Sequence, residues 1–161
     1  MTDEDATSRS AVEHQVREQL QALRAEVRSV TGSLVATSDG LLVAADLPDR
    51  PDRPEQVAAL TASLIGMARY AVDVTGTGEL TETVARGSRG YLAAFALDGA
   101  ATLTVVAEAD LNVAMFHLKL QPIRDRLVEL SQRFVGFADI ALGEPAGPAA
   151  PPPPLTRRSR R

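Results

Sequence analysis

Residues 32–45 read GSLVATSDGLLVAA, in which two short apolar runs, Ser33–Thr37 and Leu41–Ala45, flank Ser38, Asp39 and Gly40. An Asp-Gly pair between apolar runs is typical of a hairpin, because Gly adopts the positive φ that a tight turn needs. We therefore expect two antiparallel strands joined by a short turn at this point of the chain.

Helical periodicity precedes this hairpin. Apolar residues recur three or four positions apart, which is the spacing of one stripe along a helix, at Val12, Val16, Leu20, Leu23, Val27 and Val30. This pattern predicts a first helix from about Arg9 to Ser29, ended by Gly32.

A second helix is expected after the proline-punctuated loop Pro48–Pro54. Asp52 and Glu55 have the spacing of an N-terminal capping pair, and Gly76 ends the helix. Its apolar residues alternate three and four apart, at Val57, Leu60, Leu64, Met67, Ala71 and Val74. Because further apolar residues lie beside this stripe, the helix has more non-polar surface than one packing contact needs. We therefore expect it to pack against two different surfaces.

Three strands follow, over Glu79–Arg86, Tyr91–Leu97 and Ala101–Ala107, and the two-residue loop Asp98-Gly99 indicates a hairpin between the last two. The first of these strands mixes charged with apolar residues on one face and places threonines on the other. That pattern is typical of an edge strand.

A last helix is expected over about Leu111–Gln132, with Asp110 as its cap and Pro122 interrupting the backbone hydrogen bonding. We expect its core positions to be Leu111, Met115, Leu118, Leu127, Leu130 and Phe134. The short apolar segment Phe137–Leu142 can be either a strand or a loop that packs back.

The chain of 161 residues divides into one domain and two tails. We expect residues 1–8 to be a disordered N-terminus, residues 9–142 to form the domain, and residues 143–161 to form a disordered tail that is rich in proline and ends in arginines. Up to residue 144 the chain has 13 basic against 21 acidic residues, a net charge of −8. Nucleic-acid binding depends on clustered Lys and Arg, so we expect no nucleic-acid partner.

The sequence lacks the residue patterns of the common catalytic sites. It has no Cys, no Gly-Lys-Ser or Gly-Lys-Thr of a phosphate-binding loop, and its two histidines are not spaced as metal ligands. The segment Gly87-Ser88-Arg89-Gly90 lacks the upstream Gly of a nucleophile elbow, so a simple turn is expected there. We therefore predict a protein that is not an enzyme and has no catalytic, cofactor-binding or metal-binding residues.

The location of the protein is predicted from its N-terminus and its apolar runs. The N-terminus is acidic where a signal peptide has a basic region. The longest uninterrupted apolar run, Tyr91–Leu97, is far shorter than the roughly 20 residues that span a bilayer. These features predict a cytoplasmic protein without stable membrane insertion.

The expected order α-β-β-α-β-β-β-α, residues 32–44 and the segment AEADLNVAM at residues 107–115 resemble the roadblock family of dynein light chain-like and bacterial GTPase-regulator proteins. The resemblance covers about residues 10–133 and implies an α+β fold, in which a five-stranded antiparallel sheet carries helices on both faces. The Ala-rich composition and the use of Arg over Lys, 16 to 1, resemble an actinobacterial version of this family.

An edge strand has unpaired backbone groups that normally need protection. Pairing the strand with its own copy in a second chain satisfies these groups. We expect a homodimer through the strand at residues 79–86 and the second helix, which is also the arrangement that the resemblance implies. The strand seam is expected to contain Leu80, Thr81, Thr83 and Val84, and the helix contact Leu64, Met67, Ala71 and Val74. The alternative is that these helix residues only cover their own sheet.

The resemblance implies a regulatory or scaffold protein that binds a Ras-like small GTPase as a homodimer and modulates its nucleotide cycle. Arg69, Arg86 and Arg89 are the candidate GTPase contacts, since a guanidinium can neutralise charge that develops on a transferred phosphoryl group. Ordinary solvated or ion-paired arginines are the alternative. A different function, as a structural adaptor or small-molecule sensor, stays open, although six aromatic residues offer little to line a pocket.

Overall fold

The computed structural model describes residues 3–48, 53–98 and 100–142. Its elements are α1 (Asp3–Glu26), β1 (Val30–Thr37), β2 (Leu42–Asp46), α2 (Pro54–Thr75), β3 (Glu82–Gly87), β4 (Gly90–Leu97), β5 (Ala101–Glu108) and α3 (Val113–Leu142). The expected order α-β-β-α-β-β-β-α is therefore confirmed. The tail at residues 143–161, Gly99 and Asp52 of the expected capping pair lie outside the described residues.

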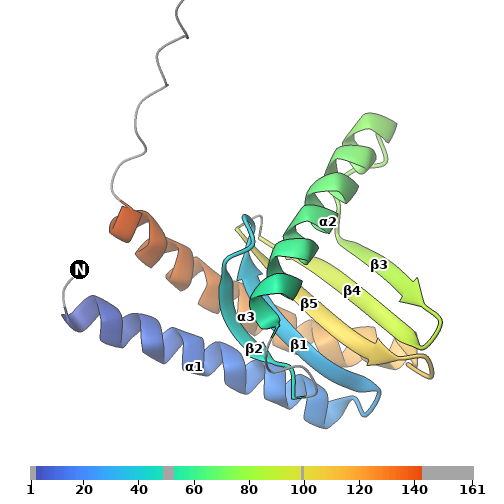
Figure 1. Cartoon of the computed structure of the whole chain (residues 1–161), viewed down its shortest axis with the longest axis horizontal. Helices are drawn as coiled ribbons and strands as arrows, with labels where there is room; N and C mark the ends of the chain where they lie inside the picture. The colour runs from blue at the N-terminus through green and yellow to red at the C-terminus, as the bar shows by residue number, and fades with distance from the viewer. Residues whose placement is uncertain (1–2, 49–52, 99, 143–161) are drawn as a thin grey trace, which may run out of the picture.

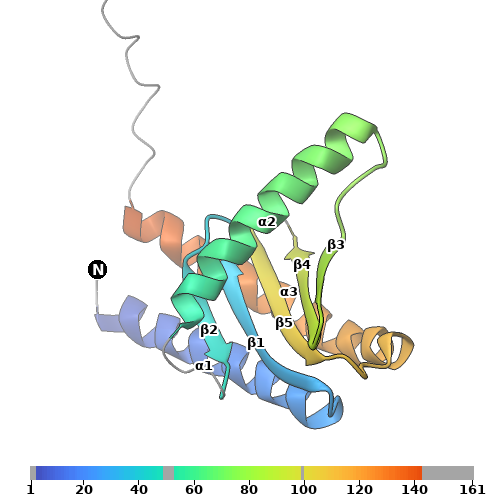
Figure 2. The ribbon, with the colours of Figure 1, turned by 45° about the vertical axis from the view of Figure 1, so that its right-hand side comes forward.

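The strands form one antiparallel sheet in the order β2-β1-β5-β4-β3. Helices α1 and α3 cover one face of this sheet, and α2 crosses the other face (Figures 1 and 2). This is the expected α+β arrangement with helices on both faces. β3 lies at one edge, as the residue pattern of that strand predicts.

The turn between β1 and β2 depends on Gly40, as predicted. Gly40 has a φ of +93°, and its amide donates to the Thr37 carbonyl oxygen at 2.9 Å. A Cβ atom at this position would lie 3.1 Å from the Cα atom of Ala59 in α2. The glycine therefore allows both the turn conformation and the close approach of the hairpin to α2.

The main hydrophobic core lies between the sheet and the layer of α1 and α3. Alternate residues of β4 and β5 point into it, because side chains of a strand alternate between the two faces. The predicted stripe of the first helix enters the same core. Its largest fully buried side chains include Val12, Val16, Leu20, Leu23, Leu97, Leu103, Val105, Leu127 and Leu130.

Helix α2 packs on the opposite face through a much smaller contact. Its buried residues are Ala58, Thr61 and Ile65, and Gly76 ends the helix in the left-handed conformation, as predicted. Most of the remaining surface of α2 is apolar. By length and composition α2 is apolar enough to cross a bilayer, a property that the length of uninterrupted apolar runs does not reveal.

Several boundaries differ from those expected in the N-terminal half of the chain. α1 ends at Glu26 and not at about Ser29, and Gly32, which was expected to end the helix, lies within β1. α1 begins at Asp3, so the helix includes most of the segment expected to precede it. Arg53 occupies the N-cap position of α2 without a side-chain hydrogen bond, and Pro54 begins the helix. Pro suits this position because the first amide of a helix has no partner within the helix.

The last helix differs more strongly from its prediction. The Met115 amide donates to Asn112 Oδ1 at 3.0 Å, so Asn112 caps the helix where Asp110 was expected to do so. The helix continues to Leu142, which makes the undecided apolar segment at its end helical. Met115 and Leu118 are 50% and 68% exposed, and their assignment to the core was wrong. Leu127 and Leu130 are buried as predicted, and the stripe continues toward the start of the helix through Ile123, Leu120 and Phe116.

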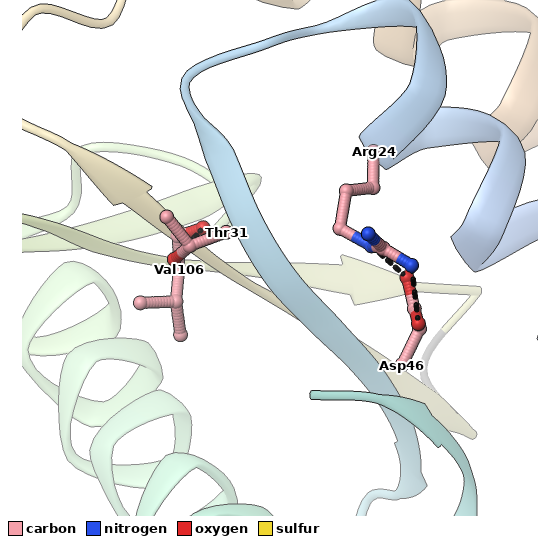
Figure 3. A network of polar contacts seen from close by, with 4 residues as sticks. All are labelled: Arg24, Thr31, Asp46 and Val106. Atoms are coloured by element: carbon pink, nitrogen blue, oxygen red, sulfur yellow. Dashed lines mark hydrogen bonds and ion pairs between the residues drawn. The ribbon is translucent and has the colours of Figure 1, made fainter. Parts of the chain in front are cut away.

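An ion pair fastens the C-terminal end of α1 to β2 (Figure 3). Arg24 donates from Nε to Asp46 Oδ2 at 2.6 Å and from Nη2 to Asp46 Oδ1 at 3.1 Å. The Asp46 side chain is only 9% exposed, whereas that of Arg24 is 40% exposed. The two-point contact fits the planar guanidinium and orients both side chains.

The unequal burial of this pair predicts an unequal effect of mutation. Arg24→Met leaves a buried carboxylate without its cation, and we expect a loss of about 2 kcal/mol in the free energy of unfolding. Asp46→Asn keeps an acceptor oxygen and leaves the better-exposed Arg24 in contact with water, so we expect less than half of that loss. Urea unfolding of both variants measures the difference, and a larger loss for Asp46→Asn would contradict this account.

Candidate functional site

Helix α2 presents an apolar stripe to solvent. Leu60, Met67 and Val74 lie seven positions apart and are 64%, 65% and 66% exposed. Tyr70 beside them is 72% exposed. Together with residues Leu64 and Ala71 they give an alternating spacing of four and three, which is the pattern of a helix that packs against another helix.

The residues predicted for the helix contact lie on this stripe. Met67, Ala71 and Val74 are exposed, and Leu64 is half-buried. The residues that cover the sheet are different ones on the opposite side of the helix. α2 therefore has a second apolar face that its own sheet leaves uncovered.

β3 forms the outer edge of the sheet beside the C-terminal half of α2 (Figure 1). Within the described part of the chain it pairs only with β4. The Ala96 amide donates to the Thr81 carbonyl oxygen at 3.4 Å, and hydrogen-bonded pairs alternate along an antiparallel ladder. The backbone groups of every second residue therefore face the free edge, and these residues are Glu82, Val84 and Arg86.

The register with β4 also assigns the side chains of β3 to faces. Val84 lies opposite Ala93, which belongs to the main core, so Val84 points to the α1 and α3 side of the sheet and is 51% exposed. Thr83 points to the α2 side and is half-buried. Leu80 is half-buried and Thr81 is exposed. None of the residues predicted for the strand seam is buried in a single copy of the chain.

The charged side chains of β3 have contacts on the α1 and α3 side. His117 Nε2 of α3 lies 3.7 Å from Glu82 Oε2. The guanidinium carbon of Arg86 lies 5.5 Å from the centroid of the Tyr91 ring, within the range of a cation–π contact. Both contacts hold charge near the free edge.

A cleft of about 950 Å³ opens between α2, the segment that leads to β3 and the end of β4. Its lining includes Arg69, Tyr70, Asp73, Leu80, Thr81 and Arg124. Arg124 Nη2 of α3 donates to the Ala96 carbonyl oxygen at 3.0 Å. A longer β3 would use that oxygen in its ladder with β4, which explains why the strand begins at Glu82 and not at the expected Glu79.

A model of the Roadblock/LC7 domain matches residues 16–107, which extend from α1 into β5. The chain belongs to this family. An uncharacterised protein of Methanocaldococcus jannaschii is 27% identical over 103 residues, which are 63% of this chain and 88% of that protein.

Solved structures agree with this roadblock assignment. The Roadblock/LC7 domain of Streptomyces avermitilis has a TM-score of 0.65 at 20% identity and covers 69% of this chain and 92% of its own. MglB of Myxococcus xanthus has a TM-score of 0.68 at 13% identity, with coverage of 76% and 91%. The gliding protein MglB of Thermus thermophilus has a TM-score of 0.68 at 17% identity, with coverage of 76% and 93%. At these identities the likeness establishes the fold.

The three candidate arginines of this roadblock domain are exposed but do not come together in one copy. Arg69 lies on α2 in the cleft, Arg86 lies on β3, and Arg89 lies in the turn between β3 and β4. Arg86 is separated from Glu82, where β3 starts beside the cleft, by roughly 13 Å, at about 3.3 Å per strand residue. The described residues contain no group of three or more His, Asp or Glu side chains that could hold a metal ion.

Sequence reasoning missed several features of this surface. The cleft depends on the angle between α2 and the sheet, and no residue pattern reports that angle. Arg124 was missed because its contact is made across the fold to a backbone oxygen. Tyr70 was detectable, since it is an aromatic residue beside an apolar helical stripe in a chain with few aromatics.

The contact of Arg124 predicts a measurable contribution to stability. Arg124→Met removes the donor to the Ala96 carbonyl, and we expect a loss of about 1 kcal/mol in the free energy of unfolding. Arg126→Met on the same helix removes an exposed charge that pairs with Glu129, and we expect a change within about 0.5 kcal/mol. Chemical unfolding of both variants tests this, and equal losses would contradict the role given to Arg124.

Proposed function

We propose that this roadblock protein is a cytoplasmic homodimer that binds a Ras-like small GTPase and modulates its nucleotide cycle without being an enzyme itself. The observation that carries the proposal is the exposed apolar stripe of α2 beside the unpaired edge of β3. The family resemblance supports the choice of GTPase as partner.

A second copy of the chain can pair with the free edge of β3 and cover the apolar stripe of α2 at the same time. Pairing β3 with the partner's β3 occupies the free backbone groups, and the same two-fold axis can bring the two α2 stripes together. Each large side chain of the stripe that becomes buried contributes about 1 kcal/mol. A membrane is a poorer cover, because Arg69 and Asp73 on the same helix each cost about 3 kcal/mol in a bilayer centre.

The proposed dimer acts on the GTPase by binding one nucleotide state more tightly than the other, which is the only way a bound partner shifts such an equilibrium. Arg69 is the best placed of the three candidate arginines for this contact. It lines the cleft beside the exposed Tyr70, whereas Arg86 already stacks on Tyr91.

The cleft also favours a second candidate function, as an adaptor or sensor that binds a small molecule. Its volume of about 950 Å³ suits a ligand pocket. Its position beside α2 would let such a ligand alter the dimer. A screen of cellular metabolites by thermal shift separates this function from GTPase binding, since only a sensor gains stability from a small molecule.

The dimer is tested by a charge placed in the stripe. Met67→Glu puts a carboxylate into the proposed helix contact, and we expect a monomer at micromolar concentration in sedimentation equilibrium. Leu118→Glu is the matched control, because Leu118 is 68% exposed on α3 and Met67 is 65% exposed on α2. The control should remain a dimer. A wild-type protein that is monomeric at micromolar concentration would contradict the proposed homodimer.

The GTPase contact is tested by turnover with a Ras-like GTPase from the same cell. The wild-type protein should bind this GTPase and change its rate of GTP hydrolysis or nucleotide exchange. If Arg69, Arg86 and Arg89 are replaced together by Ala and hydrolysis is unchanged, none of them acts as an arginine finger and the scaffold role remains. If the wild-type protein neither binds the GTPase nor alters turnover, the proposed function is wrong.

A further inference from the structure

The charges along β3 and its flanks are arranged antisymmetrically about Val84. Glu82 and Arg86 lie two positions to either side of it, and Glu79 and Arg89 lie five positions to either side. Acidic residues thus precede Val84 and basic residues follow at matched distances. Two such segments running antiparallel place opposite charges across from each other if Val84 is at the centre.

The structure places the inner pair where this arrangement can act. Glu82, Val84 and Arg86 share one face of β3, and their backbone groups point to the free edge. Arg86 is exposed and stacks on Tyr91, and Glu82 is held near His117. Both charged side chains therefore lie on the α1 and α3 face of the edge strand.

Symmetry limits how two copies can pair. If both α2 helices lie on one side of a continuous sheet, the two-fold axis is perpendicular to that sheet. Residues opposite each other in an antiparallel pair point to the same face of the sheet. At the axis, one residue must therefore lie opposite its own copy in the partner strand. Within β3 the registers that keep most of the strand paired are centred on Thr83, Val84 or Ala85.

These three registers differ in what they place opposite the charges. In the register centred on Val84, Glu82 faces the partner's Arg86 on both sides of the axis. All outward-facing backbone groups of β3 then pair with backbone groups of the partner's β3. Centred on Thr83, Glu82 faces the partner's Val84. Centred on Ala85, Arg86 faces the partner's Val84. Opposite charges across a strand pair are favourable, so the first register is preferred.

We propose that two copies pair β3 about Val84, and that the two contacts between Glu82 and the partner's Arg86 select a second copy of this chain over other sheet edges. This inference rests on the proposed homodimer. An edge strand with the opposite order of acidic and basic residues meets like charges at both contacts, and one with uniform charge meets a like charge at one of them, so both are disfavoured.

The test exchanges the charges. Glu82→Arg and Arg86→Glu each create two like-charge pairs in a homodimer, and we expect the dimer dissociation constant to rise about tenfold or more. The double variant Glu82→Arg with Arg86→Glu restores opposite charges, and its dissociation constant should return to within about threefold of the wild type. Asp125→Arg is the control for Glu82→Arg, since it makes the same change of net charge on an exposed position of α3.

Mixing the two single variants guards against a simple loss of folding. In a heterodimer of the two single variants, both contacts across the seam pair Arg with Glu. We therefore expect native mass spectrometry to detect this heterodimer in excess over both homodimers. Two variants that form this heterodimer are both folded.

The outcomes separate this inference from the homodimer itself. A wild-type monomer overturns both. A wild-type dimer whose single variants dimerise like the Asp125→Arg control leaves the homodimer standing and overturns the register centred on Val84. Single variants that dissociate but form no heterodimer, or a double variant that stays dissociated, also overturn the charge pairing.

Discussion

The sheet of this roadblock domain ends at β3, and the proposed dimer depends on that open edge. Three outward-facing residues of the strand leave backbone amide and carbonyl groups without a strand beside them in the described chain. Because no further strand of the described residues lies beyond β3 under α2, the same edge also leaves that helix with apolar side chains that its own sheet does not cover. Unpaired backbone groups and exposed apolar surface both favour a partner, and here they lie together.

One face of the sheet forms most of the core of a single copy, and the other face presents the surface proposed for association. α1 and α3 bury nearly all of the large side chains in the core, so the fold of one copy depends mainly on that layer. The core on the α2 face is much smaller, with Leu34, Ala36 and Ala58 buried in it, and Gly40 allows a close approach to α2. Its remaining apolar surface is consequently free to contact another protein. In the proposed function, the dimer would influence a GTPase through a difference in affinity for its two nucleotide states.

The fold could be predicted from residue patterns because those patterns reflect local geometry. The Asp-Gly turn at Gly40, the stripe of α1 and the edge character of β3 each depend on neighbours within a few positions. The misplaced core of α3 shows the limit of such reasoning. Met115 and Leu118 are as apolar as Leu120 and Ile123, and only the docking of the helix on the sheet determines which of these stripes is buried. The Arg124 contact and the cleft likewise arise from elements distant in sequence.

Hydrogen exchange at single amides of β3 tests the central claim most directly. In one copy, the amides of Thr83 and Ala85 bond to β4, and those of Glu82, Val84 and Arg86 face solvent. Pairing of two copies through this edge predicts slow exchange at all five amides at high protein concentration, with the second group becoming fast on dilution below the dimer dissociation constant. Fast exchange of Glu82, Val84 and Arg86 at every concentration, beside slow exchange of Thr83 and Ala85, would show that the edge stays open and contradict the account.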